Sequence, residues 1–237
     1  TPCGTLFPYT TLFRSQPNSD YDVIVVGATA SGIAASINSA REGADVLLTE
    51  RTKYIGGLAT GGLSNTDFIT YESVGGTWRE FMDRVVEYYE ETFGPNSQQV
   101  KNCMDGGYYE PKVGLKIFKD MLAEHKDKID ISLQHRLVKV ETRIKSNGYS
   151  QIEAIRVKDL QSSKIKKFTG KIFIDATYEG DLMAKAGCEY IVGSESQNKY
   201  NESIASEKAD WHVQCYNFRP TLTNDPDNRL SIPKPEE

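Results

Sequence analysis

The sequence predicts an α/β fold in which a parallel β-sheet is covered in three layers and is interrupted by a helical insertion and an antiparallel β-meander. Three observations support this prediction. Two apolar strands flank a glycine turn and a helix between residues 21 and 50, helical patterns follow between residues 77 and 125, and short β-rich segments dominate from residue 129. A strand, turn, helix and strand in about thirty residues make a βαβ unit.

The βαβ unit begins with Tyr21–Val26 (YDVIVV), a β-branched run typical of a strand that is buried on both faces. Ser31–Arg41 is predicted to be a helix, with Gly43 as a suitable C-terminal cap. Asp45–Glu50 (DVLLTE) is the second predicted strand. It leads into a loop of unusual glycine density, IGGLATGGLSNTDF from Ile55 to Phe68.

Two amphipathic helices and a series of strands follow. Thr77-Trp78-Arg79-Glu80 has the pattern of a capping box and is predicted to open a helix to about Thr92. Glu110-Pro111 opens a second helix to about His125, with proline at a tolerated first-turn position. Asn147-Gly148 predicts a hairpin turn. The predicted strands are Ile129–Leu133, Leu137–Ile144, Ile152–Val157, Ile165–Phe168 and Lys171–Ala176, and a short helix over Asp181–Ala186 ends at Gly187.

The composition is that of an ordinary globular protein. The chain has 237 residues, of which 38% are hydrophobic and 26% charged, enough for one large domain or two small ones. A net charge of −5 argues against a nucleic-acid surface, and no apolar run approaches the length of a membrane span. The four cysteines and three histidines lack metal-ligand spacing. We expect a small-molecule partner, and no nucleic acid, membrane span or metal.

The first residues do not resemble any structural or targeting pattern. Residues 5–15, TLFPYTTLFRS, have neither the basic region nor the continuous apolar region of a signal peptide. They match, letter for letter, the translation of a common short-read sequencing adapter. We therefore expect residues 1–15 to be an assembly artefact that contributes nothing to the fold.

The turn after the first strand is close to a dinucleotide-binding fingerprint. In GATASG, Gly27 and Gly32 hold the first and last glycine positions of GxGxxG, and Thr29 replaces the middle one. The hydroxyl of Thr29 offers a donor to a phosphate oxygen. A phosphate-binding P-loop is excluded because Gly32 is followed by Ile33-Ala34, where that motif needs lysine and then serine or threonine.

An acidic residue at the end of the second strand supports the nucleotide interpretation. Glu50 lies where a carboxylate accepts hydrogen bonds from an adenosine ribose. A nicotinamide-binding domain usually continues into a crossover helix, but this chain runs into Gly56-Gly57 and Gly61-Gly62. Missing side chains there allow a large flat ligand to approach closely. Together with the later antiparallel strands, this favours FAD over NAD.

Four stretches carry a resemblance to a known family: GATASG, YIGGLATGG, FIDATYEGDLMAKAG and VQCYNFRPTLTNDPDNR. With them the chain, from about residue 21 to residue 237, resembles the FAD-dependent oxidoreductases sometimes labelled xanthan-lyase-like, a branch of the glutathione-reductase-type flavoproteins. The resemblance implies a Rossmann-like FAD/NAD(P)-binding domain of three layers with an antiparallel meander crossover. Tyr178 departs from the pattern, because related flavoproteins often have glycine there.

The resemblance also implies roles for individual residues. The turn would hold the pyrophosphate, Glu50 the ribose and Arg51 the adenine side, while Leu137 would offer backbone groups to adenine. Gly56, Gly57 and Leu58 would lie along the ribityl chain and the isoalloxazine. The full set of expected cofactor-binding residues is Gly27, Ala28, Thr29, Ala30, Ser31, Gly32, Glu50, Arg51, Gly56, Gly57, Leu58, Leu137, Ala176, Thr177 and Asp181.

The expected domains are a discontinuous FAD-binding domain over residues 16–70 and 129–193, a helical insertion over 71–128, and the start of a substrate-side domain over 194–237. We expect the flavin domain to lack its C-terminal part, and the chain by itself to be inactive. The predicted activity is hydride transfer from a small organic or sugar-like substrate to flavin N5. Two alternatives remain open: flavin chemistry without net oxidation, and a non-catalytic FAD-binding fragment.

No catalytic acid or base stands out in the sequence. Cys103 and the run Tyr108-Tyr109-Glu110 lie in a plausible loop, but such residues are more often packed than catalytic. His212 and Arg219 are candidates only by their place in the chain. The catalytic residues are therefore unassigned.

Overall fold

The computed structural model describes residues 20–63, 65–68, 70–146, 148–213 and 223–229. The expected adapter-derived segment, residues 1–15, lies outside the described residues. The chain divides into two compact units between Tyr190 and Ile191. The first unit contains the sheet and its helices, and each unit is described separately below.

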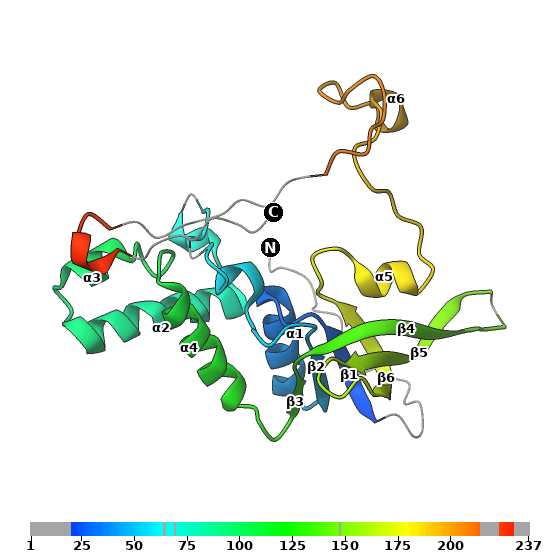
Figure 1. Cartoon of the computed structure of the whole chain (residues 1–237), viewed down its shortest axis with the longest axis horizontal. Coiled ribbons are helices and arrows are strands. Elements are labelled where there is room, and N and C mark those ends of the chain that lie inside the picture. The colour runs from blue at the N-terminus through cyan, green and yellow to red at the C-terminus, as the bar shows by residue number, and fades with distance from the viewer. Residues whose placement is uncertain (1–19, 64, 69, 147, 214–222, 230–237) are drawn as a thin grey trace, which may run out of the picture. The chain divides into compact units, whose positions relative to one another are not determined.

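A mixed six-stranded sheet with the order β3-β2-β1-β6-β5-β4 organises the first unit. Its parallel part contains β1 (Tyr21–Val26), β2 (Val46–Thr49), β3 (Ile129–Ser132) and the end of β6 (Ile165–Asp175). Helix α1 (Ala30–Arg41) connects β1 to β2. The predicted βαβ unit and α/β fold class are confirmed, and Figure 1 shows these strands beside α1.

The antiparallel meander shares its last strand with the parallel sheet. β4 (His135–Ile144) pairs with β5 (Ser150–Asp159), and β5 pairs with the first half of β6, over Ile165 to Thr169. From Gly170 onward, β6 pairs with β1 in parallel. The prediction of two separate strands in this region is wrong, because residues 165–175 form one continuous strand.

Side chains of alternating strand residues build two separate cores. Val23 and Val25 point towards the helices, whereas Ile24 and Val26 point towards the meander, as the period of two along a strand requires. The meander therefore lies over the face of the parallel sheet that α1 does not cover, which gives three layers. Its buried members are Leu137, Val140, Ile155 and Val157.

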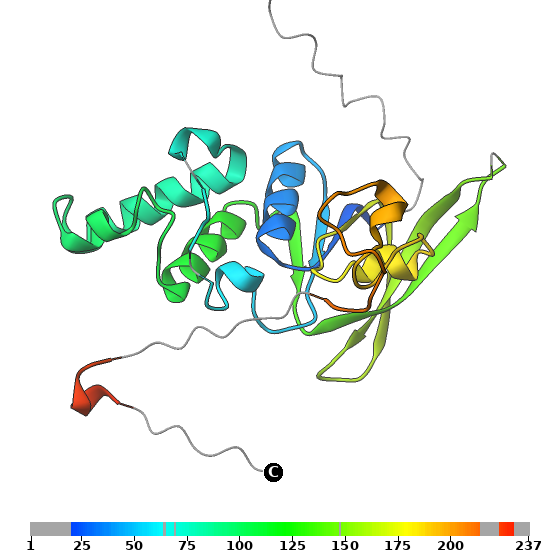
Figure 2. The same ribbon diagram turned by 90° about the horizontal axis from the view of Figure 1, so that it is seen from above.

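The segment between β2 and β3 is mainly helical. It contains α2 (Gly76–Phe93), the short α3 (Gln98–Asn102) and α4 (Pro111–Ala123), preceded by the 3-10 turns η2 (Gly57–Ala59) and η3 (Tyr71–Ser73). In Figures 1 and 2, α2 and α4 lie on the α1 side of the sheet, away from the β4–β5 hairpin. Their shared core includes stacked aromatic rings, among them Phe81 on Phe118 with 4.4 Å between ring centroids.

The predicted capping box at the start of α2 is wrong. The helix begins at Gly76 with Gly75 as its cap, and no side chain caps it. Thr77 therefore lies inside the first turn, where its hydroxyl accepts a hydrogen bond from Asn38 of α1 at 2.6 Å. The buried hydroxyl is used to join two helices, and no capping function is left for it.

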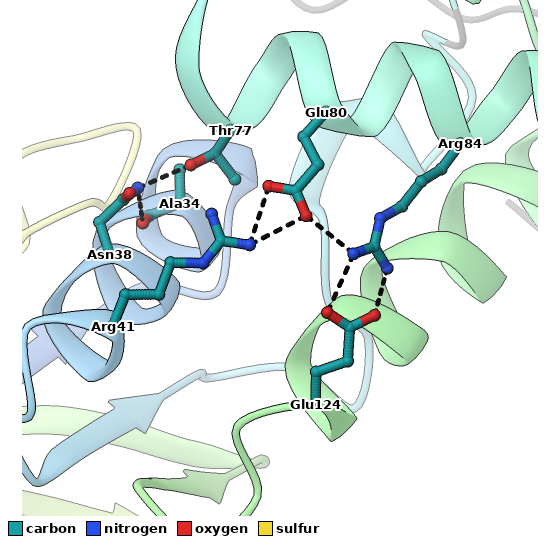
Figure 3. A network of polar contacts seen from close by, with 7 residues as sticks. All are labelled: Ala34, Asn38, Arg41, Thr77, Glu80, Arg84 and Glu124. Carbon is teal, nitrogen blue, oxygen red and sulfur yellow. Dashed lines mark hydrogen bonds and ion pairs between the residues drawn. The ribbon is translucent and has the colours of Figure 1, made fainter.

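An ion-pair chain joins the insertion to α1 beside this contact (Figure 3). Arg41 of α1 contacts Glu80 of α2 at 2.8 Å, and Glu80 also pairs with Arg84 at 2.8 Å. Arg84 in turn donates from both of its terminal nitrogens to the carboxylate of Glu124, which directly follows α4. The Arg84 guanidinium lowers the pKa of the Glu124 carboxyl below its usual value. The three helices are thus held together at one end.

The remaining elements are short. α5 (Asp181–Lys185) closes the first unit, and the second unit contains α6 (Gln197–Tyr200) and the 3-10 turn η4 (Pro226–Asn228). In the part of the chain that the structure describes, no helix combines the length and the apolar character needed to cross a membrane. The same residues contain no group of three or more His, Cys, Asp or Glu side chains placed to hold a metal ion.

Candidate functional site

A cavity of about 610 Å³ opens at the carboxyl ends of β1, β2 and β6. Its walls come from the Gly27 turn, the segment from Thr49 to Tyr54, the glycine-rich loop, the start of β4 and the loop after β6. In open α/β sheets, ligands bind outside the carboxyl ends of the strands, where neighbouring connections diverge. The volume lies within the range of about 300–1,000 Å³ that small-molecule sites occupy.

The two glycines of the first turn are required by close packing. Gly27 has φ of +101°, and a Cβ on it would lie 2.7 Å from the carbonyl oxygen of Ala176. A Cβ on Gly32 would overlap the carbonyl oxygen of Gly27. The turn thus lies directly against the end of β6, and it brings the N-terminus of α1 to the cavity.

Thr29 has a structural function at this turn. It is the N-cap of α1, where its hydroxyl accepts from the Gly32 N–H at 3.3 Å. The same hydroxyl donates to the carbonyl oxygen of Ala176 at 2.8 Å. The expectation that this hydroxyl donates to a phosphate is therefore corrected, because its proton is already used inside the protein. The other N–H groups of the first turn of α1 have no partner within the helix, as at any helix start.

Glu50 holds the turn by a direct hydrogen bond. One carboxylate oxygen accepts the Ala28 N–H at 2.9 Å, and the other accepts the Thr52 N–H at 2.8 Å. A carboxylate has about four lone-pair sites. Two acceptor sites therefore remain for a ligand hydroxyl. The neighbouring Arg51 forms a half-exposed ion pair with Glu179 at 3.2 Å.

The glycine-rich loop is attached to the first turn by its backbone. Gly56 N–H donates to the Ala28 carbonyl at 2.6 Å. The space beside Gly56 is filled by Thr60, and the space beside Gly57 by the phenol of Tyr178. The expected open approach to this pair of glycines is thus corrected, since protein side chains already occupy it.

The loop after β6 is fixed by its own hydrogen bonds. Asp175 accepts from both the N–H and the hydroxyl of Thr177, at 3.0 and 2.7 Å, and from the Met183 N–H at 2.8 Å. The Thr177 hydroxyl accepts from the Asp181 N–H at 2.8 Å. This network gives the segment from Asp175 to Asp181 one backbone arrangement beside the cavity.

The expected cofactor residues fall into two groups. One group lines the cavity: Gly27, Thr29, Glu50, Arg51, Gly57, Leu137, Thr177 and Asp181. The residues of the other group are near lining residues in the chain but are not part of the lining themselves: Ala28, Ala30, Ser31, Gly32, Gly56, Leu58 and Ala176. The structure therefore gathers residues from distant parts of the chain around one space.

Sequence reasoning missed several lining residues. Pro111 and Leu115, at the start of α4, form part of the wall, as do His135 and Arg136 at the start of β4. His135 is held by the Leu133 carbonyl at 2.6 Å and by Lys166 at 3.0 Å. The sequence predicts α4 itself but contains no local signal that α4 approaches the cavity, because that approach depends on tertiary packing. The two β4 residues directly precede the expected Leu137, so that expectation could have been extended to them.

Among the described residues considered for acid or base chemistry, none is part of this cavity's lining. Burial raises the pKa of the Cys103 thiol, which donates to the Val100 carbonyl. Tyr109 is buried, and burial raises the pKa of its phenol. His212 is exposed and belongs to the second unit. Arg219 lies outside the described residues.

Comparison with protein-family models identifies the chain's family. Residues 22–237 match the model described as FAD dependent oxidoreductase. The chain belongs to this family. FAD is its cofactor, and the predicted resemblance is confirmed. No curated protein sequence gives a significant match.

Several solved structures are similar to this FAD-dependent oxidoreductase family member. THI4 of Thermovibrio ammonificans has 18% identity and a TM-score of 0.47, with 80% of this chain and 75% of that chain covered. Glycerol-3-phosphate dehydrogenase from Bacillus halodurans, complexed with FAD, has 15% identity and a TM-score of 0.43, with 73% of this chain and 37% of that chain covered. The 3-ketosteroid-delta4-(5alpha)-dehydrogenase from Rhodococcus jostii RHA1 has 16% identity and a TM-score of 0.40, with 70% of this chain and 47% of that chain covered.

The residues around the cavity fit a dinucleotide. The Gly27 turn and the N-cap Thr29 line the cavity, so the N-terminus of α1 is next to it, and a helix N-terminus favours phosphate. Glu50 supplies an acceptor beside this turn, and Arg51 and Arg136 supply positive charge. Apolar side chains of Val26, Leu115 and Leu137 complete the lining. These features match a ligand with phosphates, ribose hydroxyls and flat rings.

Proposed function

We propose that FAD binds in the cavity at the carboxyl ends of β1, β2 and β6. The observation that carries the proposal is the juxtaposition of the Gly27 turn, which opens α1, with Glu50, which accepts the Ala28 N–H of that turn at 2.9 Å. In this proposal, the turn binds phosphate and the neighbouring Glu50 carboxylate accepts from a ribose hydroxyl. That is the arrangement a dinucleotide needs.

The fifteen expected residues take their roles from this arrangement. Gly27, Ala28, Thr29, Ala30, Ser31 and Gly32 form the turn that holds the pyrophosphate, with Thr29 fixing the shape of this turn. Glu50 binds the ribose, and Arg51 and Leu137 lie at the adenine. Gly56, Gly57 and Leu58 flank the ribityl chain and the flavin ring. Ala176, Thr177 and Asp181 close the site from the β6 side.

The proposed activity is oxidation of a small organic or sugar-like molecule. Bound FAD supplies a hydride acceptor at N5 of its ring. The protein's part is to bind the cofactor in one orientation and to keep water from the reacting face. We assign no acid or base, because no titratable side chain has been identified beside a substrate.

We assign the proposed functions to three domains of the chain. Residues 16–70 and 129–193 form the FAD-binding domain, and residues 71–128 form the helical insertion. This insertion contributes Pro111 and Leu115 to the cavity wall. Residues 194–237 belong to a substrate-side domain. The ion-pair chain from Arg41 to Glu124 supports the insertion's role, because it fixes α4 relative to α1.

Two measurements test the function. The protein is purified, denatured, and its released nucleotide identified; we expect FAD. NAD without any flavin would refute the cofactor assignment. Candidate alcohols and sugars are then added to the flavin-loaded protein without oxygen. Loss of the flavin's visible absorbance supports oxidation, whereas product formation with the flavin still oxidised would indicate chemistry without net oxidation.

A further inference from the structure

The loop after β6 places one aromatic side chain across the candidate site. Tyr178 follows Thr177, whose N–H and hydroxyl are both bound by Asp175. The backbone on the N-terminal side of Tyr178 is therefore fixed, and its side chain lines the cavity. Its phenol extends to the glycine-rich loop on the opposite wall.

The Tyr178 hydroxyl accepts a hydrogen bond from the Leu58 N–H at 2.7 Å. The contact needs glycine at position 57, because a Cβ on Gly57 would overlap this hydroxyl. Gly57 also has φ of +54°, in the left-handed region that favours glycine. The glycine of one loop and the tyrosine of the other therefore form a matched pair.

This contact competes with the proposed ligand for the same donor. In the proposed function, Gly57 and Leu58 lie along the ribityl chain and the flavin ring. A single Leu58 N–H cannot donate fully to both the phenol and the ligand. The Tyr178 side chain is 49% exposed, so it has solvent on one side into which it can rotate.

A second bridge from the same loop is weak. Glu179 pairs with Arg51 at 3.2 Å, and the two side chains are 45% and 55% exposed. Exposed ion pairs of this kind add little to stability. The hydrogen bond of Tyr178 and the ion pair of Glu179 thus both join this loop to the opposite wall at exposed positions.

We propose that Tyr178 is an autoinhibitory gate of the cofactor site. The inference rests on the proposed function. In the absence of cofactor, the phenol binds Leu58 N–H and covers the flavin end of the cavity. Cofactor entry requires the phenol to rotate out, after which Leu58 N–H is available to the ligand. Since only the open form binds, the closed population lowers the apparent affinity for FAD.

The test compares Tyr178→Phe with the unaltered protein, and Tyr190→Phe, an exposed tyrosine outside the cavity lining, serves as the control. Phenylalanine keeps the ring and loses the acceptor. We expect about fivefold tighter FAD binding and faster association, because one ordinary hydrogen bond no longer holds the gate. In the FAD-free protein, hydrogen exchange at the Leu58 amide is expected to accelerate in Tyr178→Phe alone.

The outcomes separate the gate from the function. If the unaltered protein binds FAD and Tyr178→Phe binds equally or more weakly, the gate is refuted and the cofactor site stands. Unchanged exchange at Leu58 would also refute the gate, because the contact would then not protect this amide. If neither protein binds FAD, the proposed function fails and the gate fails with it.

Discussion

Thr29 stands where a dinucleotide-binding turn has its middle glycine, and its side chain is used within the protein. It caps α1 and ties the turn to the end of β6 through the Ala176 carbonyl. The sequence predicted the turn from its glycines and from the strand before it. It could not predict the hydroxyl's partner, because Ala176 lies 147 residues away and meets Thr29 only in the folded sheet.

Thr29→Val tests this structural role. Valine keeps the shape but removes both hydrogen bonds, so we expect the free energy of unfolding to fall by about 1–3 kcal/mol. Denaturant unfolding measures the change. Thr70→Val, at an exposed position whose side chain caps nothing, is the control. Equal stability of Thr29→Val and the unaltered protein would contradict the assignment.

Glu50 combines a structural function with the binding function that we propose for it. Glu50→Ala removes the acceptor for two backbone N–H groups and the acceptor proposed for a ribose hydroxyl, so we expect FAD binding to weaken by about 1–3 kcal/mol. Titration of the cofactor-free protein with FAD measures this. Glu50→Gln keeps one acceptor oxygen and is expected to lose less, and the exposed Glu42→Ala is expected to lose nothing. An unchanged dissociation constant for Glu50→Ala would place the carboxylate outside the site.

At the scale of elements, the strands were predicted better than their ends. The strands predicted over Ile165–Phe168 and Lys171–Ala176 are one strand, β6, which continues through Gly170. A Cβ at Gly170 would lie 2.9 Å from the side chain of Ile24 on β1. The glycine serves close packing inside a strand. The start of α2 shows the same limit. Thr77 matched a local capping pattern, but its hydroxyl binds Asn38 of another helix, which no local pattern reveals.

A carboxylate on β1 links three elements of the sheet. Asp22 accepts from the Asp45 N–H before β2 at 2.9 Å and pairs with Lys171 of β6 at 2.5 Å. The Lys171 ammonium and the Asp45 N–H hold the pKa of Asp22 below its ordinary value. The charged form therefore stabilises the fold at pH values above the carboxyl's unfolded pKa. This contribution is lost as the pH falls through the lower folded pKa.

Asp22→Asn is expected to lower the free energy of unfolding at neutral pH by about 1–3 kcal/mol, because it removes the charge from two hydrogen bonds. The difference from the unaltered protein should shrink as the pH falls below the folded pKa of Asp22, where both carry a neutral side chain. Urea unfolding at several pH values measures it. A difference that stays constant into the acid range would show that the charge is not the cause.

At the scale of the whole molecule, the cavity joins segments that are far apart in the chain. The fingerprint turn, Glu50 and the loop after β6 carried sequence signals, and they were expected at one site. Pro111 and Leu115 did not, since α4 reaches the cavity only through packing on α2 and the ion-pair chain to Arg41. Tyr178 was noted as a departure, but its contact with Leu58 depends on how two loops meet.

The measurement that tests the cofactor site most directly is hydrogen exchange of the backbone with and without saturating FAD. We predict slower exchange on FAD addition in four segments, residues 27–32, 50–58, 135–137 and 176–181, and no slowing with NAD. The β4–β5 hairpin beyond residue 140 serves as an internal control and should not change. Protection confined to other segments, or equal protection by NAD, would contradict the proposed binding of FAD at the Gly27 turn.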